Sequence, residues 1–240
     1  MRALILAAGR GERMRPLTDA TPKPLLAAGG RRLIEWQIAA LVRAGLRDVV
    51  INTAHLAPRF PAALGDGAAL GARIAYAQEG LQAHDALETL GGIVNALPLL
   101  GEAPFVVASG DVVTTYPYQR LAAAAQRLAA GELDAHLVLV DNPPYHPQGD
   151  MGLADGRATI QPPRLTYGNI GVFAPRLFAG LPARRQRLFP WLYQFVAAGR
   201  VGAEHWTGPW ANVGTPAELE ELARELPGWR WDDPPLGRPA

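Results

Sequence analysis

The chain has 240 residues, and its 23 basic and 22 acidic side chains leave a formal net charge of +1, which argues against a broad nucleic-acid-binding surface. There is no cysteine, so disulfides, thiolate metal sites and a cysteine nucleophile are excluded. The length suits one α/β domain, and the lack of a signal peptide or a membrane-length apolar run predicts a soluble, cytoplasmic protein without a membrane partner.

The chain begins with a predicted strand at Ala3–Leu6 that runs directly into a glycine turn at residues 9–11. Because glycine has no side chain, the backbone N–H groups of such a turn can approach phosphate oxygens closely. Arg13 and Lys23 add fixed positive charge shortly after the turn. These features together predict a binding site for a nucleoside triphosphate.

The turn matches neither of two common phosphate-binding motifs. A P-loop needs Gly-x-x-x-x-Gly-Lys-Ser/Thr, and the sequence contains no such run. A dinucleotide fingerprint needs a third glycine three residues after the second, but that position is Met14. A dehydrogenase is therefore not expected.

Apolar runs then alternate with segments of helical periodicity, which is typical of βα units and a largely parallel sheet. Further strands are predicted at Asp48–Thr53, Arg73–Gln78, Phe105–Ala108 and Ala135–Val140. Helices are predicted at Arg32–Ala44, Thr89–Leu99 and Tyr118–Ala130.

After residue 141 the pattern changes. A tight turn at Asp155–Gly156 predicts a hairpin between the strands Met151–Ala154 and Arg157–Ile160. The remaining predicted elements are a strand at Leu165–Phe173 and helices at Phe189–Ala198 and Pro216–Leu226.

The N-terminal motif resembles the signature of the sugar-phosphate nucleotidylyltransferases, or NDP-sugar pyrophosphorylases. That signature is Leu-x-x-Gly-x-Gly-x-Arg followed by Pro-Leu-Thr and Pro-Lys-Pro, and it appears in order at residues 6–13, 16–18 and 22–24. Gly110–Asp111 and Gly214–Pro216 also match the family, so the resemblance extends to about residue 225.

The resemblance implies an α/β, Rossmann-like three-layer nucleotide-diphospho-sugar transferase fold with a mixed, mostly parallel sheet. Larger relatives carry a β-helix of hexapeptide repeats, but no repeat of fixed period occurs here, so no β-helix domain is expected. We predict one nucleotidyltransferase domain at 1–226, with a nucleotide-binding half at 1–141 and a sugar-binding half at 142–226. An irregular tail is expected at 227–240.

The reaction that the resemblance implies is attack by a sugar 1-phosphate oxygen on the α-phosphorus of a triphosphate, with release of pyrophosphate. Such a transfer needs charge neutralisation and in-line placement more than a covalent nucleophile. The resemblance assigns the β- and γ-phosphates to Arg13. It places Lys23, which has a proline on each side, beside the α-phosphate. Arg13, Lys23 and Asp111 are the expected catalytic residues.

A magnesium site is expected near Asp111. This residue follows a predicted buried strand at the end where open α/β sheets bind ligands, and a carboxylate there suits Mg²⁺. The family often has a second aspartate before Gly-Thr-Pro, but this chain has Asn212. An amide oxygen can still coordinate Mg²⁺ without adding charge, and a purely structural turn is the alternative role for Asn212.

The resemblance also assigns substrate contacts. The nucleotide is expected to contact the backbone of the first turn and a base-pocket glutamate, namely Ala7, Ala8, Gly9, Gly11 and Glu79. The sugar is expected to contact Glu88, Thr89 and Asn169. Arg164 is a candidate for the sugar phosphate, because residues 142–226 contain no lysine. The structural alternatives are a surface glutamate at Glu79 and a strand-edge turn at Asn169.

The segment Leu87–Gly92 resembles the short bacterial subgroup that acts on N-acetylmuramate α-1-phosphate in cell-wall recycling. It therefore implies UTP and that sugar 1-phosphate as substrates. Glucose or mannose 1-phosphate, or phosphocholine with cytidine triphosphate, would keep the reaction but change the substrates. A catalytically silent nucleotide-binding subunit is a further alternative, and only Asn212 favours it.

Overall fold

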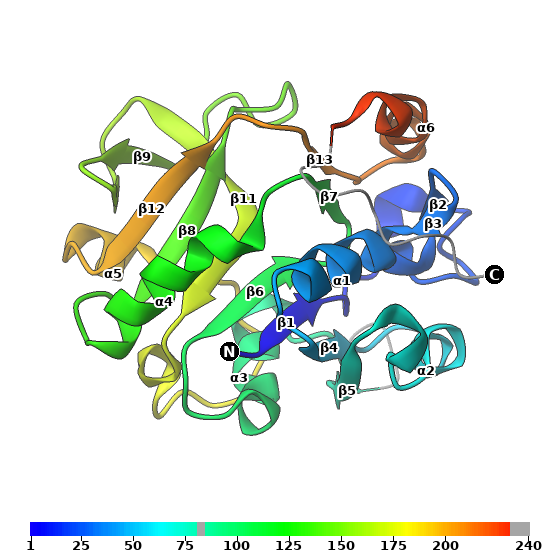
Figure 1. The fold of residues 1–240 in the computed structure, drawn as a ribbon, viewed down its shortest axis with the longest axis horizontal. Coiled ribbons are helices and arrows are strands. Elements are labelled where there is room, and N and C mark those ends of the chain that lie inside the picture. Colours follow the sequence, from blue (N-terminus) through cyan, green and yellow to red (C-terminus); the bar gives the residue numbers. More distant parts are fainter. Residues whose placement is uncertain (81–84, 231–240) are drawn as a thin grey trace.

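A nine-stranded sheet forms the centre of the fold (Figure 1). The computed structural model describes residues 1–80 and 85–230. The strand order is β5-β4-β1-β6-β11-β8-β12-β10-β9. The first four strands in this order are parallel to one another: β1 (Ala3–Leu6), β4 (Asp48–Thr53), β5 (Arg73–Gln78) and β6 (Phe105–Ser109). They belong to successive βα units, as the alternating sequence pattern predicts.

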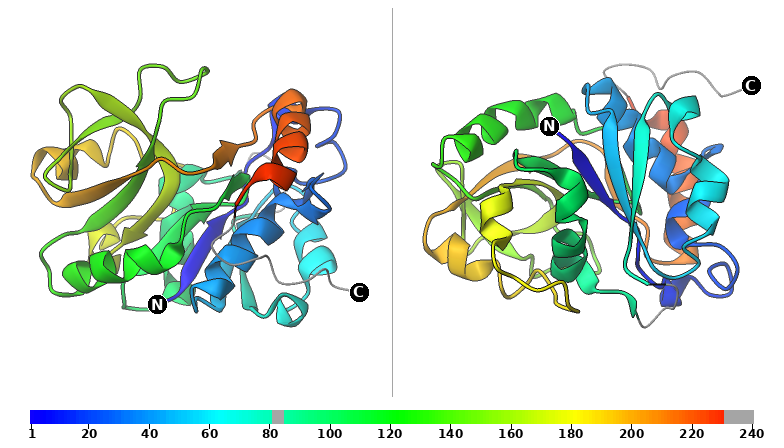
Figure 2. Two further views of the ribbon diagram at one scale, coloured as in Figure 1. Left: turned by 45° about the horizontal axis from the view of Figure 1, so that its top comes forward. Right: turned by 90° about the horizontal axis from the view of Figure 1, so that it is seen from below.

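The other five strands make the sheet mixed. They are β8 (Ala135–Val140), β9 (Met151–Ala154), β10 (Arg157–Thr159), β11 (Arg164–Phe173) and β12 (Val201–Trp206). β11 runs antiparallel between β6 and β8, whereas β12 is parallel to β8. β9 pairs with β10 and also with the first residues of β11, so this end of the sheet closes on itself (Figure 2).

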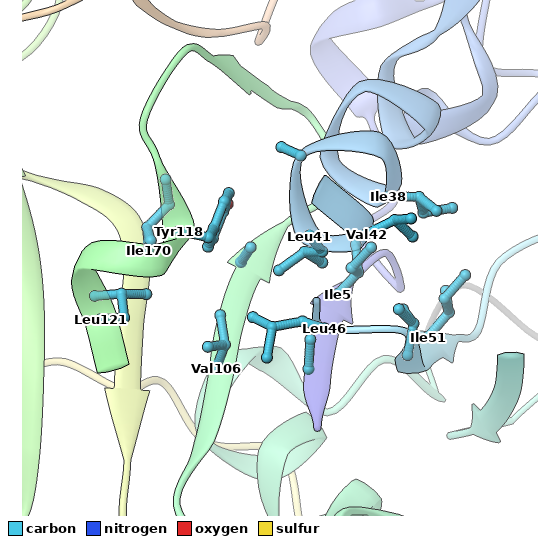
Figure 3. Close-up of a cluster of buried hydrophobic side chains, with 14 of the residues drawn as sticks. Ile5, Ile38, Leu41, Val42, Leu46, Ile51, Val106, Tyr118, Leu121 and Ile170 are labelled. Carbon is cyan, nitrogen blue, oxygen red and sulfur yellow. The ribbon is translucent and has the colours of Figure 1, made fainter. Parts of the chain in front are cut away.

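Helices cover both faces of the sheet, which gives three layers (Figure 2). On β1, Ile5 belongs to the apolar cluster beneath α1 (Leu33–Arg43) and α4 (Leu121–Ala129), which Figure 3 shows. Its neighbour Leu4 points the other way, into the cluster that includes α3 (Glu88–Leu100). Because the strands are covered on both sides, they appear in the sequence as continuous apolar runs. The expected three-layer α/β fold with a mixed sheet is confirmed. The sheet is not mostly parallel as expected, because four of its strand pairings are parallel and five are antiparallel.

A third apolar cluster joins the loop after β1 to the C-terminal helix α6 (Pro216–Glu225). Its fully buried members include Met14, Val113, Val213 and Leu222. Two short ribbons frame it: β7 (Val112–Thr114) with β13 (Trp210–Asn212), and β2 (Ala27–Ala28) with β3 (Arg31–Arg32). The N-terminal loop is therefore held by residues from the far end of the chain.

Some elements differ from the sequence-based expectation. Two elements are not predicted from the sequence. In β12, Gly202 and Glu204 interrupt the apolar pattern. The helix α2 (Arg59–Leu64) has only six residues, too few to show a helical periodicity. The helix expected at Phe189–Ala198 is only α5 (Tyr193–Ala197). Pro190 disfavours helical geometry at the residue before it, and turns occupy the intervening positions.

The C-terminal tail begins with more structure than expected. Leu226–Gly228 forms a 3₁₀ turn, and Trp229 packs against the third cluster. The rest of the predicted tail, residues 231–240, lies outside the described residues. Within the described ranges, no helix combines the length and apolar character needed to cross a bilayer.

Candidate active site

A cavity of about 620 Å³ opens where β1, β4 and β6 end. Leu6, Asn52 and Ser109 bring the carboxyl-terminal ends of these three strands to its wall. Ligands bind at this edge of open α/β sheets. Nine of the remaining wall residues have polar or charged side chains: Arg10, Glu12, Arg13, Lys23, Glu88, Thr89, Asp111, Arg185 and Arg187. The others are small or apolar: Ala7, Ala8, Gly9, Gly11, Pro24, Ala86 and Gly214.

The two glycines of the turn have different surroundings. Gly11 has a φ of +63°, and a Cβ there would lie 2.9 Å from Cγ2 of Thr18. The Thr18 hydroxyl donates a 2.8 Å hydrogen bond to the Gly11 carbonyl and is itself buried. A Cβ at Gly9, in contrast, would meet no atom within 4 Å, so the backbone there faces open space. One glycine thus shapes the turn and the other leaves it accessible.

Arg13 lies at the border between this loop and the C-terminal segment. A Cβ at Gly214 would come within 3.0 Å of an Arg13 guanidinium nitrogen, so the glycine leaves room for the arginine. The backbone N–H of Gly214 donates to Glu218 of α6 at 2.6 Å, and this bond fixes the position of the segment. The loop after β1 and the segment before α6 therefore meet at Arg13.

Lys23 and Asp111 form an ion pair in the wall of the cavity. Their side chains are only 15% and 19% exposed. Lys23 is the only lysine in the chain, and it begins a 3₁₀ turn. It lies between Pro22 and Pro24, which restrain its backbone. The structure therefore brings two of the three predicted catalytic residues into direct contact.

Asn212 reaches the same region through the β7–β13 ribbon. It pairs with Val112, and the N–H of Val213 donates to the Asp111 carbonyl at 3.0 Å. The Asn212 side chain lies near the hydroxyl of Tyr145, a residue of the loop after β8 that sequence reasoning missed. Asn212 itself does not line the cavity. Its backbone lies next to that of Asp111, and its role as a metal ligand stays a prediction.

Glu79 lies behind the cavity wall. One of its carboxylate oxygens accepts from Asn52 Nδ2 at 2.6 Å, and the other accepts from the Leu87 N–H at 2.7 Å. Asn52 in turn accepts a 2.6 Å hydrogen bond from the N–H of Ala7. Burial raises the pKa of the Glu79 carboxyl above its usual value. Glu79 thus supports Asn52, and Asn52, which sequence reasoning missed, is the member of this pair that lines the cavity.

The predicted sugar-side residues divide into two groups. Glu88 and Thr89, at the start of α3, line the cavity. Asn169 lies at an irregularity in the pairing of β11 with β8 and does not line the cavity, which agrees with its structural alternative. Arg164 is also elsewhere, donating to the Ile160 carbonyl beside a separate, smaller cavity. A direct sugar contact by Asn169 or Arg164 stays a prediction.

Two arginines that sequence reasoning missed, Arg185 and Arg187, line the cavity instead. Arg185 pairs with Glu88 at 3.2 Å. The segment that carries them has no motif, and backbone hydrogen bonds hold it against the start of α3. The only signal in the sequence was compositional, since three of the four residues at 184–187 are arginine.

Residues 2–156 match the sequence profile of the nucleotidyl transferase family. The chain belongs to this family. This nucleotidyl transferase is 43% identical over 236 residues to N-acetylmuramate α-1-phosphate uridylyltransferase of Neisseria meningitidis serogroup B, an alignment that covers 96% of this chain and 100% of that protein. The enzyme of the same name from Caulobacter vibrioides is 35% identical over 239 residues, with 92% and 96% covered.

Solved structures agree on the fold of this nucleotidyl transferase. A crystal structure described as a glucose-1-phosphate thymidylyltransferase from Bacillus anthracis superposes with a TM-score of 0.82. The match covers 100% of this chain and 98% of that one, at 17% sequence identity. At this low identity the likeness concerns the fold alone.

Proposed function

We propose that the protein is a Mg²⁺-dependent uridylyltransferase that joins UTP and N-acetylmuramate α-1-phosphate and releases pyrophosphate. The observation that carries the proposal is the Lys23–Asp111 pair, set in one cavity with the glycine turn and Arg13. Two relatives that align over nearly their whole length, both named N-acetylmuramate α-1-phosphate uridylyltransferase, support the choice of substrates. We place the reaction in the cytoplasm, in the recycling of cell-wall sugars.

In the proposed reaction, an oxygen of the sugar 1-phosphate forms a bond to the α-phosphorus of UTP. The bond from that phosphorus to the bridging oxygen of the β-phosphate breaks, and pyrophosphate leaves with the electron pair. The N–H groups of the glycine turn and the Arg13 guanidinium hold the β- and γ-phosphates. Lys23 neutralises the charge that develops around the α-phosphoryl oxygens. No covalent nucleophile is needed.

The donor set fits a magnesium ion. Mg²⁺ commonly binds through one or two carboxylates together with substrate phosphates, and Asp111 supplies one carboxylate beside the predicted triphosphate site. Among residues 1–80 and 85–230, no group of three or more His, Cys, Asp or Glu side chains is arranged so that it could hold a metal ion, so the protein would rely on phosphate oxygens for further ligands. Asp111, with Asn212 as a second oxygen donor, would hold the ion, which would screen phosphate charge.

A screen of pyrophosphate release tests the proposal. Four nucleoside triphosphates would be combined with the 1-phosphates of N-acetylmuramate, N-acetylglucosamine, glucose and mannose, and with phosphocholine. We expect the highest kcat/KM for UTP with N-acetylmuramate α-1-phosphate, and loss of activity when a chelator removes Mg²⁺. Higher turnover of any other pair would contradict the substrate assignment. No turnover of any pair would favour a silent subunit.

A further inference from the structure

The segment Arg184–Arg187 is fixed rigidly against the start of α3. The carbonyl of Gln186 accepts from the N–H groups of Leu90 at 3.0 Å and Gly91 at 3.2 Å, and the Gln186 N–H donates to Leu87 O at 2.9 Å. A Cβ at Gly91 would overlap the Arg184 carbonyl oxygen, so the two backbones are in close contact. Segments held in this way present their side chains in defined directions.

Gln186 is the anchored residue, and Arg185 and Arg187 flank it. Both arginines line the cavity. Arg185 is already paired with Glu88. Glu88 has a φ of +61°, an uncommon conformation for a residue other than glycine. Such backbone outliers persist where the surrounding structure holds them and are frequent at binding sites.

Arg187 has no such partner in the described part of the chain. Within residues 1–80 and 85–230, no hydrogen bond or ion pair involves its guanidinium, although it lines a cavity that also contains three carboxylates, Glu12, Glu88 and Asp111. Each of these carboxylates is paired with another cation, and Lys23 and Arg13 already supply positive charge near Asp111. Arg187 is thus a positive group that can bind an anion of the ligand.

We propose that Arg187, positioned beside the Arg185–Glu88 pair, binds a carboxylate on the sugar and so selects acidic sugar 1-phosphates. The inference rests on the proposed function, because the lactyl ether of N-acetylmuramate carries such a carboxylate and the otherwise identical N-acetylglucosamine does not. A guanidinium presents a planar fork of donors that matches a carboxylate. Selection follows because a neutral sugar would leave the arginine without this bond.

The test compares two substrates that differ only in the lactyl group. kcat/KM would be measured with UTP for N-acetylmuramate α-1-phosphate and for N-acetylglucosamine α-1-phosphate, in the wild type and in Arg187→Gln. We expect the ratio of the two values to fall by about 10- to 100-fold in the variant, which is the usual effect of a lost charged hydrogen bond. Arg184→Gln is the matched control, since Arg184 is in the same segment but does not line the cavity. Its ratio should equal that of the wild type.

The outcomes separate the inference from the proposed function. An equal loss of kcat/KM on both substrates would show that Arg187 binds the shared phosphate. Unchanged kcat/KM values for both substrates would show that it binds neither group. Each result overturns the inference. The wild-type measurements alone decide the proposed function, because they show whether N-acetylmuramate α-1-phosphate is a substrate. Arg187 is exposed and makes no internal polar contact among the described residues, so the variant should fold; circular dichroism would check this.

Discussion

At the residue scale, a substitution in the Lys23–Asp111 pair tests the proposed reaction most directly. Lys23→Met should lower kcat by about 100- to 1,000-fold, because it removes a fixed charge beside the reacting phosphoryl group. The KM for UTP should change less, since the glycine turn and Arg13 remain. Pyrophosphate release in single-turnover assays would measure the effect. Arg15→Met is the control: Arg15 is 66% exposed and pairs with Asp19 outside the cavity, so turnover should be retained.

Gly9 and Gly11 should respond differently to the same substitution. Gly11→Ala imposes a left-handed conformation on alanine and a contact with Thr18, so the free energy of unfolding should fall by about 1–2 kcal/mol. Gly9→Ala meets no neighbouring atom, so stability should hold within about 0.5 kcal/mol while UTP affinity falls as the methyl group enters the cavity. Urea denaturation and nucleotide titration would measure these two effects. Equal destabilisation by both variants would contradict the different roles given to the two glycines, Gly11 in shaping the turn and Gly9 in leaving it accessible.

At the element scale, Glu204 ties β12 to neighbouring elements through charge. Burial by itself would raise the pKa of Glu204, but hydrogen bonds from His136, Tyr116 and Arg120 lower it to about 2. A carboxylate with a lowered pKa stabilises the fold above its unfolded-state pKa, and this contribution is lost as the pH falls towards the folded-state value. The wild type should therefore lose stability between about pH 4.5 and 2.

Glu204→Gln isolates this contribution. Because the side chain cannot ionise, the variant should be less stable than the wild type at pH 7, by up to about 3 kcal/mol, and the difference should shrink as the pH falls through that range. Denaturation midpoints measured at several pH values would show it. A difference that stays constant with pH would mean that Glu204 contributes through packing and not through its charge.

Helices and strands were predictable from the sequence where a local sequence pattern determines their type and bounds. The strands at β1, β4, β5 and β8 are found at the predicted bounds, because each is a short apolar run beside a turn or helix. β12 is not predictable in this way, because it contains the charged residue Glu204. The partners that hydrogen-bond to the Glu204 carboxylate, Tyr116 and Arg120, are distant in the sequence. The same limit applies to the site. The glycine turn, Lys23 and Asp111 belong to local motifs, whereas Arg187, Asn52 and Tyr145 reach their positions through long-range packing.

At the scale of the whole molecule, the two predicted halves share one sheet. β11, from the second half, lies between β6 and β8, which both belong to the first. Without it, β6 and β8 would each lose a long antiparallel neighbour, and the inner apolar clusters that β11 completes would be exposed. Unpaired strand edges of this kind promote aggregation.

We therefore expect a fragment of residues 1–141 to be unfolded or aggregated, although it contains the whole glycine turn, Lys23 and Asp111. Co-expression with residues 142–240 should restore a folded complex, because β11 can then enter the sheet and Val213 and Leu222 can pack on Met14. Size-exclusion chromatography and circular dichroism would measure folding, and UTP titration would measure recovery of the site. A monomeric, folded 1–141 fragment that binds UTP would show that the nucleotide-binding half is independent of the second half.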